Sequence, residues 1–242
     1  MKQVQSEAIV LKGVNYGESD LMVTLLTSEL GKVGAIARSG RKSQRRFGGA
    51  LQAASVIDAL LVSKREGLYE IKEATFIGGG FSSENFAAFA QLSYFCELAL
   101  AVCQEEERSG GIYEFLRNLF IHYQEKGHTL LEFMIFEFRM LELFGFLPHF
   151  KNCLNCFQPP DGKKKYYIAP DHGAFYCPNH RPSGGYEISA DEALVLTFLV
   201  TRELPPAEFP QKINYHKLRR IINSYIALHI GVTLKSEKLL LI

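Results

Sequence analysis

The residues best suited to chemistry are four metal-ligand types grouped in two short knuckles. Cys153 and Cys156 form a CxxC pair, and after twenty residues Cys177 and His180 form a CxxH pair. Three thiolates and one imidazole are the closed tetrahedral ligand set of structural zinc sites. The spacing therefore predicts one structural Zn²⁺ ion held by these four residues.

Other interpretations of the knuckles stay open. His172 lies between them and could replace His180 as the fourth ligand, although its spacing to Cys177 is less regular. The cysteines could also be core residues, which the surrounding prolines and glycines make a poor fit. A redox pair at Cys153 and Cys156 fits less well, because no strand is predicted before it and a second knuckle follows.

The sequence offers no familiar catalytic motif. It contains no HExxH, no GxSxG and no Walker-type phosphate loop. The run 78–80 is three glycines without the Lys-Ser/Thr of a phosphate loop, so a hinge is the better interpretation. Four protein ligands would leave a zinc ion no open position for water. We therefore expect no catalytic centre, and a zinc hydrolase is the least favoured alternative.

A second group of residues could bind a polyanion. Five cations fall within nine residues, and no acidic residue lies between Glu29 and Asp58. Such a loop is expected to project into solvent unless phosphates neutralise it. A solvated surface loop is the competing explanation. The predicted DNA-contacting cations are Arg38, Arg41, Lys42, Arg45 and Arg46.

Aromatic platforms for stacking bases are scarce in the N-terminal region, and the chain has no Trp. Tyr16 and Phe47 flank turns and could face outward, and Tyr16 is the aromatic that we expect at the DNA site. Tyr69 and Phe76 are expected in the core. Binding should thus depend on phosphate contacts, with little sequence preference.

Other cations are less informative. Lys163, Lys164 and Lys165 could be a solvated turn or a second contact patch. Lys64 and Arg65 are expected at a hairpin tip, where they could extend the first patch. A third set is expected on the solvent face of a helix: Lys217, Arg219 and Arg220.

The elements that must position the basic loop are short strands. Five extended segments separated by turn residues precede residue 78, and they span 8–11, 21–27, 32–38, 56–62 and 68–74. Five strands in this length predict a closed barrel of the oligonucleotide/oligosaccharide-binding (OB) type over 1–78. Strand count alone leaves an SH3-like barrel as the alternative.

Beyond residue 78 the hydrophobic period becomes helical. The sequence predicts a helical domain formed by 79–148 and 188–242, interrupted by a zinc-binding insertion over 149–187 that is rich in Cys, Pro, Gly, Lys and Tyr. Ser189 and Glu192 have the spacing of a capping box at the start of a helix. The expected fold class is α+β.

Composition sets further bounds. The 242 residues are 47% hydrophobic, which is enough for a sizeable core, and the formal net charge is only +1. No apolar run reaches the length of a membrane span, and the start lacks the apolar core of a signal peptide. Cys96 and Cys103 lie in an apolar segment and are expected to be reduced core thiols. A soluble protein of the cytoplasm, associated with the nucleoid, fits best.

Several N-terminal motifs together resemble the RecO family of bacterial recombination mediators. They are Tyr16-Gly17-Glu18-Ser19-Asp20, Thr24-Leu25-Leu26-Thr27, Gly31-Lys32 and Ala37-Arg38-Ser39-Gly40-Arg41-Lys42. The Cys-x2-Cys and Cys-x2-His knuckles resemble the zinc module of many family members. One departure from the family pattern is the apolar, glycine-rich run 47–50 at the far end of the basic loop.

The resemblance implies an OB domain, a helical domain and a zinc module. It also implies binding of single- and double-stranded DNA, annealing of complementary strands, and help in loading recombinase onto strands coated by single-strand-binding protein, with RecR as a partner. The basic loop 38–46 matches the family's basic segment after the third strand as a group. The alternative function is a zinc-containing protein-interaction module that does not bind nucleic acid directly.

Overall fold

The computed structural model describes residues 3–65, 68–81, 85–108, 110–123, 129–202 and 213–240. The chain forms two compact units. The first comprises Met1–His128 together with Leu234–Leu240, and the second comprises Thr129–Thr233. Each unit is described by itself below.

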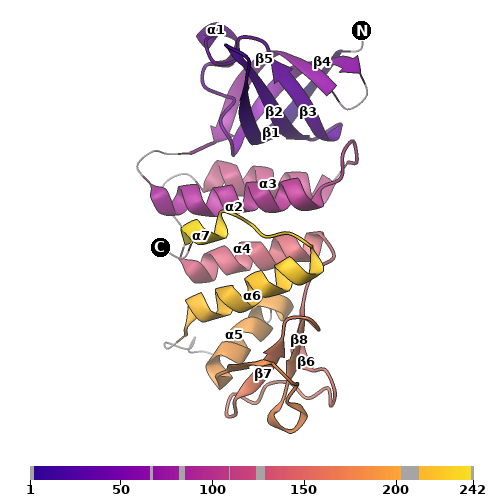
Figure 1. Ribbon diagram of the computed structural model, residues 1–242, viewed down its shortest axis with the longest axis vertical. Helices are drawn as coiled ribbons and strands as arrows, with labels where there is room; N and C mark the ends of the chain where they lie inside the picture. The colour runs from indigo at the N-terminus through magenta and orange to yellow at the C-terminus, as the bar shows by residue number, and fades with distance from the viewer. Residues whose placement is uncertain are drawn as a thin grey trace. The chain divides into compact units, whose positions relative to one another are not determined.

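The first unit is built on a closed five-stranded barrel (Figure 1). Its strands are β1 (Gln3–Tyr16), β2 (Asp20–Thr27), β3 (Gly31–Ala37), β4 (Ser55–Arg65) and β5 (Leu68–Gly79). They close in the order β1-β2-β3-β5-β4, with β3 and β5 parallel and the other pairs antiparallel. This arrangement is OB-like, so the predicted α+β class with an N-terminal five-stranded barrel is confirmed.

Alternation of side chains fills the barrel. Val33, Ala35 and Ala37 on β3 point into the core, as their period of two predicts. Gly78 and Gly79 continue β5 and lie opposite Val56 and Ser55 of β4. The hinge expected at the glycine run is therefore wrong for Gly78 and Gly79.

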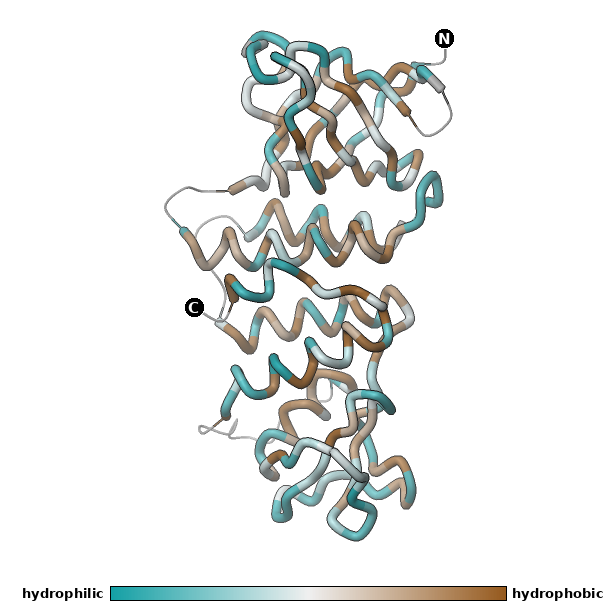
Figure 2. The backbone as a smooth tube through the Cα atoms, viewed as in Figure 1, coloured by the Kyte–Doolittle hydropathy of each residue, from teal (hydrophilic) through white to brown (hydrophobic). Residues whose placement is uncertain are grey.

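The basic loop contains a short helix, α1 (Gln44–Phe47), that the sequence did not predict. Phe47 is only 2% exposed and packs into the barrel core with Ala50 and Leu51. The expectation that Phe47 faces solvent is wrong, because the apolar run after the cations closes one end of the barrel. Figure 2 shows the contrast between the hydrophilic loop and the hydrophobic strands beneath it.

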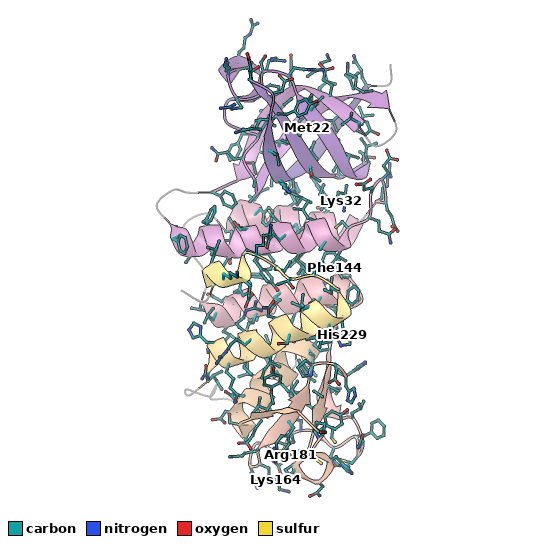
Figure 3. The ribbon with its side chains drawn as sticks, viewed as in Figure 1. Met22, Lys32, Phe144, Lys164, Arg181 and His229 are labelled. Carbon is teal, nitrogen blue, oxygen red and sulfur yellow. The ribbon has the colours of Figure 1, made fainter. Side chains whose placement is uncertain are left out.

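Besides α1, the described part of this unit contains the helices α2 (Phe86–Val102), α3 (Gly110–His122) and α7 (Glu237–Leu240). Nζ of Lys32, labelled in Figure 3, donates to the carbonyl of Leu100 on α2 at 3.0 Å. Nε of Arg117 on α3 lies 2.6 Å from Glu7 on β1. Compactness thus groups α2 and α3 with the barrel, and the predicted domain limits at 78, 148 and 187 stay a prediction.

An acidic segment, Glu105–Arg108, runs beside β3 in this unit. The backbones of Glu105 and Lys32 form an isolated parallel β-bridge, and the N–H of Glu106 donates to the carbonyl of Lys32 at 3.0 Å. A Cβ at Gly31 would lie 2.2 Å from the carbonyl oxygen of Glu107, and Gly31 has a φ of 71°. Only glycine fits here, because it has no Cβ to clash with Glu107 and adopts a positive φ without strain.

The second unit combines helices with a small sheet. The helices are α4 (Leu130–Leu143), α5 (Ala190–Thr201) and α6 (Tyr215–His229). The sheet has the order β6-β8-β7-β9, from β6 (His149–Cys153), β7 (Tyr166–Ala169), β8 (Ala174–Tyr176) and β9 (Tyr186–Ile188). The rings of Phe150 and Phe175 stack at 5.1 Å between β6 and β8.

Local capping signals fix where two of these helices begin. The hydroxyl of Ser189 accepts from the backbone N–H of Glu192, and the Glu192 carboxylate accepts from the N–H of Ser189, so the predicted capping box is confirmed. Thr129 and Glu132 form the same arrangement at α4. Each box satisfies two N–H groups that a helix start would leave without partners.

Candidate metal centre and nucleic-acid interface

The two knuckles bring their four ligand atoms together. One sulfur or nitrogen atom from each of Cys153, Cys156, Cys177 and His180 lies within 4.8 Å of the others. The Sγ atoms of Cys156 and Cys177 are 3.8 Å apart. Nδ1 of His180 lies 3.2 Å from Sγ of Cys177 and 3.8 Å from Sγ of Cys153.

These distances match the edges of a tetrahedron around a zinc ion. Zinc–sulfur bonds of about 2.3 Å and zinc–nitrogen bonds of about 2.05 Å give edges of about 3.8 Å between sulfurs and about 3.6 Å between sulfur and nitrogen. The residues therefore fit a metal that prefers four nitrogen and sulfur ligands. The cluster could bind a metal ion as a closed site.

Tight turns position the ligands. After β6, the N–H of Phe157 donates to the carbonyl of Cys153 at 2.9 Å, and Phe157 adopts a φ of 59°. The second knuckle continues from Cys177 into a 3-10 turn, η1 (Pro178–His180), in which the N–H of His180 donates to the Cys177 carbonyl at 2.9 Å. Each turn folds the second ligand of a knuckle back towards the first.

Backbone N–H groups stabilise the thiolate form of Cys153, the most buried of the three cysteines. Burial on its own raises the pKa of Cys153, but backbone hydrogen bonds from Cys156, Cys177 and Asn155 outweigh it and bring that pKa to about 6. Burial raises the pKa of Cys177. The N–H groups directed at Cys153 suit a metal-bound thiolate, since a coordinating sulfur carries negative charge.

His172 takes another role. Its Nδ1 forms a short hydrogen bond with the hydroxyl of Tyr176, and its Nε2 lies 3.7 Å from the carboxylate of Asp171. The ligand cluster contains His180 and not His172. The alternative that His172 serves as the fourth ligand is therefore not supported by the geometry.

The basic loop is anchored to the start of β2 by Asp20. The N–H of Ser39 donates to Oδ1 of Asp20 at 2.7 Å, and Arg38 pairs with Oδ2 at 3.0 Å. The hydrogen bond from Ser39, and then that from Arg38, keep the pKa of Asp20 below its ordinary value. A Cβ at Gly40 would lie 3.0 Å from the side chain of Ala37. Gly40 thus permits a close contact with Ala37 that a side chain would crowd.

Arg46 also holds the loop. Its Nε donates to the hydroxyl of Ser43 at 3.1 Å, and its Nη2 donates to the carbonyl of Arg38 at 2.5 Å. Its guanidinium lies 4.9 Å from the centre of the Phe47 ring. Two of the five predicted DNA-contacting cations, Arg38 and Arg46, therefore form hydrogen bonds that hold the loop in place.

The other three cations face solvent. Arg41, Lys42 and Arg45 are exposed, and within the described residues none of them lies in an ion pair with a carboxylate. Nη1 of Arg41 donates to the backbone carbonyl of Glu18, at 3.3 Å. Concentrated positive charge that is not paired with carboxylates favours a polyanion.

A face of the barrel continues from this loop. Tyr16 is 55% exposed and lies opposite Asp20, the residue that anchors the loop. Lys12 and Val14 are exposed on the same face of β1, because residues two apart point the same way. Val14 lies opposite Met22, which Figure 3 labels on the barrel. Sequence reasoning missed Lys12, although its spacing to Tyr16 carries the signal.

Tyr69 and Phe76, the other two aromatic residues of the N-terminal region, were both expected in the barrel core, and only one of them lies there. Tyr69 is half-buried and packs against the core, as predicted. Phe76 is 49% exposed, so its assignment to the core is wrong. A bulge where Ile57 lies opposite Phe76 interrupts the alternation of β5.

Comparison with known proteins adds evidence over nearly the whole chain. The family model for Recombination protein O N terminal matches residues 1–79, and that for Recombination protein O C terminal matches residues 83–238. The chain belongs to the RecO family. It is 28% identical over 237 residues to the DNA repair protein RecO of Myxococcus xanthus, covering 98% of this chain and 96% of that protein. It is 29% identical over 187 residues to the DNA repair protein RecO of Thermodesulfovibrio yellowstonii, covering 76% and 73%.

RecO proteins are recombination mediators and not enzymes, so membership of the family confirms the prediction of a protein without catalytic activity. Among the described residues, none of the helices is both long enough and apolar enough to cross a membrane.

Cations elsewhere in this RecO chain are partly neutralised. Lys165 pairs with Glu187 at 2.6 Å, and Lys164 lies 3.8 Å from Asp161. Lys64 pairs with Glu70. Arg219 is 0% exposed and forms an ion pair with Glu137. The predicted solvent face for Arg219 is therefore wrong.

The two cysteines outside the knuckles are in the core. Cys96 and Cys103 are 3% and 5% exposed on and just after α2. Burial raises the pKa of the Cys96 thiol to about 12. A thiol that stays protonated is a poor nucleophile and a poor metal ligand.

Proposed function

We propose that this chain is a DNA-binding recombination mediator. It would bind single- and double-stranded DNA, anneal complementary strands and assist recombinase loading onto protein-coated single strands, with RecR and single-strand-binding protein as partners. Its membership of a family of DNA repair proteins supports this role. Because bacterial DNA lies in the nucleoid, we expect the protein to act in the cytoplasm, at the nucleoid.

The observation that carries the proposal is the unneutralised charge of Arg41, Lys42 and Arg45 at the barrel edge. OB barrels bind oligonucleotides on the face of strands 2 and 3 and in the β1–β2 and β4–β5 loops. The basic loop begins where β3 ends and is anchored to Asp20, directly after the β1–β2 turn. Arg38 and Arg46 hold the loop in shape and add to its charge. Tyr16 and Lys12 extend the same surface along β1.

This surface favours binding without sequence preference. Cations contact phosphates, which carry no sequence information. Tyr16 is one exposed aromatic side chain on which a base could stack, and stacking tolerates every base. We expect affinity to depend strongly on salt and weakly on sequence.

The second part of the proposal is one structural Zn²⁺ ion at Cys153, Cys156, Cys177 and His180. The support is the fit of the cluster to a tetrahedral shell of three sulfurs and one nitrogen. Such an ion, when bound, cross-links the turn after β6 to the turn after β8. Four protein ligands leave it no position for substrate, so its contribution is stability of the sheet β6-β8-β7-β9.

A salt series tests DNA binding. Fluorescence anisotropy would measure the affinity of the wild type and of R41A/K42A/R45A for several unrelated single-stranded oligonucleotides. Three lost phosphate contacts at about 0.7 per phosphate should flatten the slope of log affinity against log salt by about 2. All oligonucleotides should lose affinity alike.

A matched control removes the same charge elsewhere. In K163A/K164A/K165A, two of the three lysines already have acidic neighbours, and the salt slope should change by less than about 0.5, well below the 0.7 expected for one phosphate. Equal affinity and slope in the wild type and a folded R41A/K42A/R45A variant would remove the loop from the DNA site. Equal losses in both variants would indicate a general charge effect.

One observation favours the second candidate, a protein-interaction module that does not bind DNA directly. Leu154 and Phe157 on the first knuckle are 40% and 72% exposed, although both are apolar. If the wild type binds none of the oligonucleotides at low salt, this candidate replaces the first.

A further inference from the structure

The sulfur ligands of the cluster differ in their access to solvent. Cys153 is 1% exposed, whereas Cys156 and Cys177 are half-buried. Cys156 and Cys177 both line a cavity of about 400 Å³. Within the described residues, neither Cys153 nor His180 lines that cavity. A small polar reagent thus reaches two of the three sulfurs from one side.

The two accessible sulfurs are also close enough to react with each other. They lie 3.8 Å apart, and a disulfide requires about 2.05 Å. Both belong to short turns, so a movement of about 1.8 Å closes the gap without breaking a strand. Cys153 is less suited to pair with either, since it is buried and ends strand β6.

The remaining cavity lining suits a polar oxidant. It includes Gln158, Asp161, Asn179 and Lys164, which Figure 3 labels. Gln158, Asn179 and Lys164 can donate hydrogen bonds to a small molecule with two oxygens, and the Asp161 carboxylate can accept one from it. Metal-bound cysteines are held as thiolates, which is the form that oxidants attack.

We propose that Cys156 and Cys177 are an oxidant-sensitive pair, and that hydrogen peroxide joins them in a disulfide and releases the metal ion. This rests on the metal site proposed above. Cys96 and Cys103, although thiols, are excluded from the reaction by their burial.

The reaction balances in two steps. One thiolate of the pair attacks an oxygen of hydrogen peroxide, the O–O bond breaks, and a sulfenic acid and a hydroxide form. The second thiolate then attacks the sulfenic sulfur, the S–S bond forms, and a second hydroxide leaves. Two protons from solvent convert both hydroxides to water. Two thiolates are oxidised, and one peroxide is reduced.

Loss of the metal follows from ligand number. Cys153 and His180 remain, and two ligands do not close a tetrahedral shell. Reduction of the disulfide by a thiol restores four ligands, so the site can be refilled when zinc is present. Because metal binding contributes to folding of such a module, oxidation should also loosen the sheet.

The test uses wild-type protein, whose zinc content is first measured by elemental analysis. Hydrogen peroxide is then added in steps. A chromogenic chelator reports released zinc, and alkylation followed by peptide mass spectrometry maps the disulfides. We expect one zinc released for each Cys156–Cys177 disulfide, unmodified Cys96 and Cys103, and recovery with thiol reductant and zinc. A C96A/C103A variant should release zinc in the same way.

Two results would overturn the proposal. One is a zinc-containing protein that keeps its metal under peroxide until the chain unfolds. The other is disulfides dominated by Cys153. A protein purified without zinc would instead contradict the metal site, and mapping of disulfides in that metal-free protein would still decide whether Cys156 and Cys177 pair.

Discussion

Glu137 on α4 and Arg219 on α6 form an ion pair from which water is excluded: the two residues are both 0% exposed. The Arg219 guanidinium also lies 5.0 Å from the centre of the Phe133 ring. Removing one partner of a buried pair leaves an uncompensated charge, which costs about 3–5 kcal/mol. The pair therefore locks α4 to α6.

The first prediction follows from this pair. Arg219→Ala should lower the free energy of unfolding by about 3 kcal/mol or more, measured by urea denaturation. Glu137→Leu combined with Arg219→Met should recover much of that loss, because no charge is then buried. Arg220→Ala, at the exposed neighbouring position, should change stability by less than about 0.5 kcal/mol. A loss at Arg220 as large as that at Arg219 would show that the pair is not the cause.

The second prediction concerns Arg46 and Arg45, neighbours of equal charge. Arg46 bonds to Ser43 and to the Arg38 carbonyl, whereas Arg45 is exposed. Arg46→Ala should destabilise the first unit by about 1–2 kcal/mol through the lost hydrogen bonds and the lost contact with Phe47. Arg45→Ala should leave stability within about 0.5 kcal/mol. Thermal melts compare the two, and equal melting temperatures would mean that Arg46 does not hold the loop.

The third prediction concerns pH. Hydrogen bonds from Lys64 and Lys72 lower the pKa of Glu70 from 4.5 to about 2. A carboxylate with a lowered pKa stabilises the fold above its unfolded pKa, and that stability is lost as the pH falls from about 4.5 to about 2. Glu70→Gln should therefore cost about 1 kcal/mol at pH 7, limited by the exposure of both lysines. The difference from wild type should disappear near pH 2, and a pH-independent difference would refute the assignment.

The fourth prediction is metal removal. A chelator should lower the melting temperature of the second unit, and a loss of only about 2 kcal/mol would shift a unit of this size by roughly 10 °C. Calorimetry before and after chelation measures the shift. Added Zn²⁺ should restore it and Ca²⁺ should not, because calcium prefers oxygen ligands. An unchanged melting temperature in metal-free protein would contradict a structural role.

Local patterns in the sequence were sufficient to predict several features of the fold and of the candidate site. The knuckle spacing predicts the four residues that the fold brings within 4.8 Å, and the capping box at Ser189 predicts the start of α5. The alternation of Val33, Ala35 and Ala37 predicts which face of β3 lines the barrel. Each of these signals lies within a few residues or in one repeated type of ligand.

Features that depend on distant partners were missed. Arg219 on a helix looks like a solvent-facing cation until Glu137, 82 positions away, is placed against it. Phe47 follows the five cations of the basic loop and resembles part of an exposed loop, but the open barrel end needs an apolar side chain to close it.

The return of α7 to the first unit has a consequence for synthesis of the chain. The N–H and hydroxyl of Ser236 donate to one carboxylate oxygen of Glu97, on α2, at 2.9 Å and 2.7 Å. A ribosome makes the barrel, α2 and α3 long before residue 236, and all of the second unit is translated in between. The order of translation and the order of completion therefore differ. Translation of the first unit begins before that of the second, but the contact between Ser236 and Glu97 can form only after the second unit has been translated. For most of translation, α2 therefore lacks this contact.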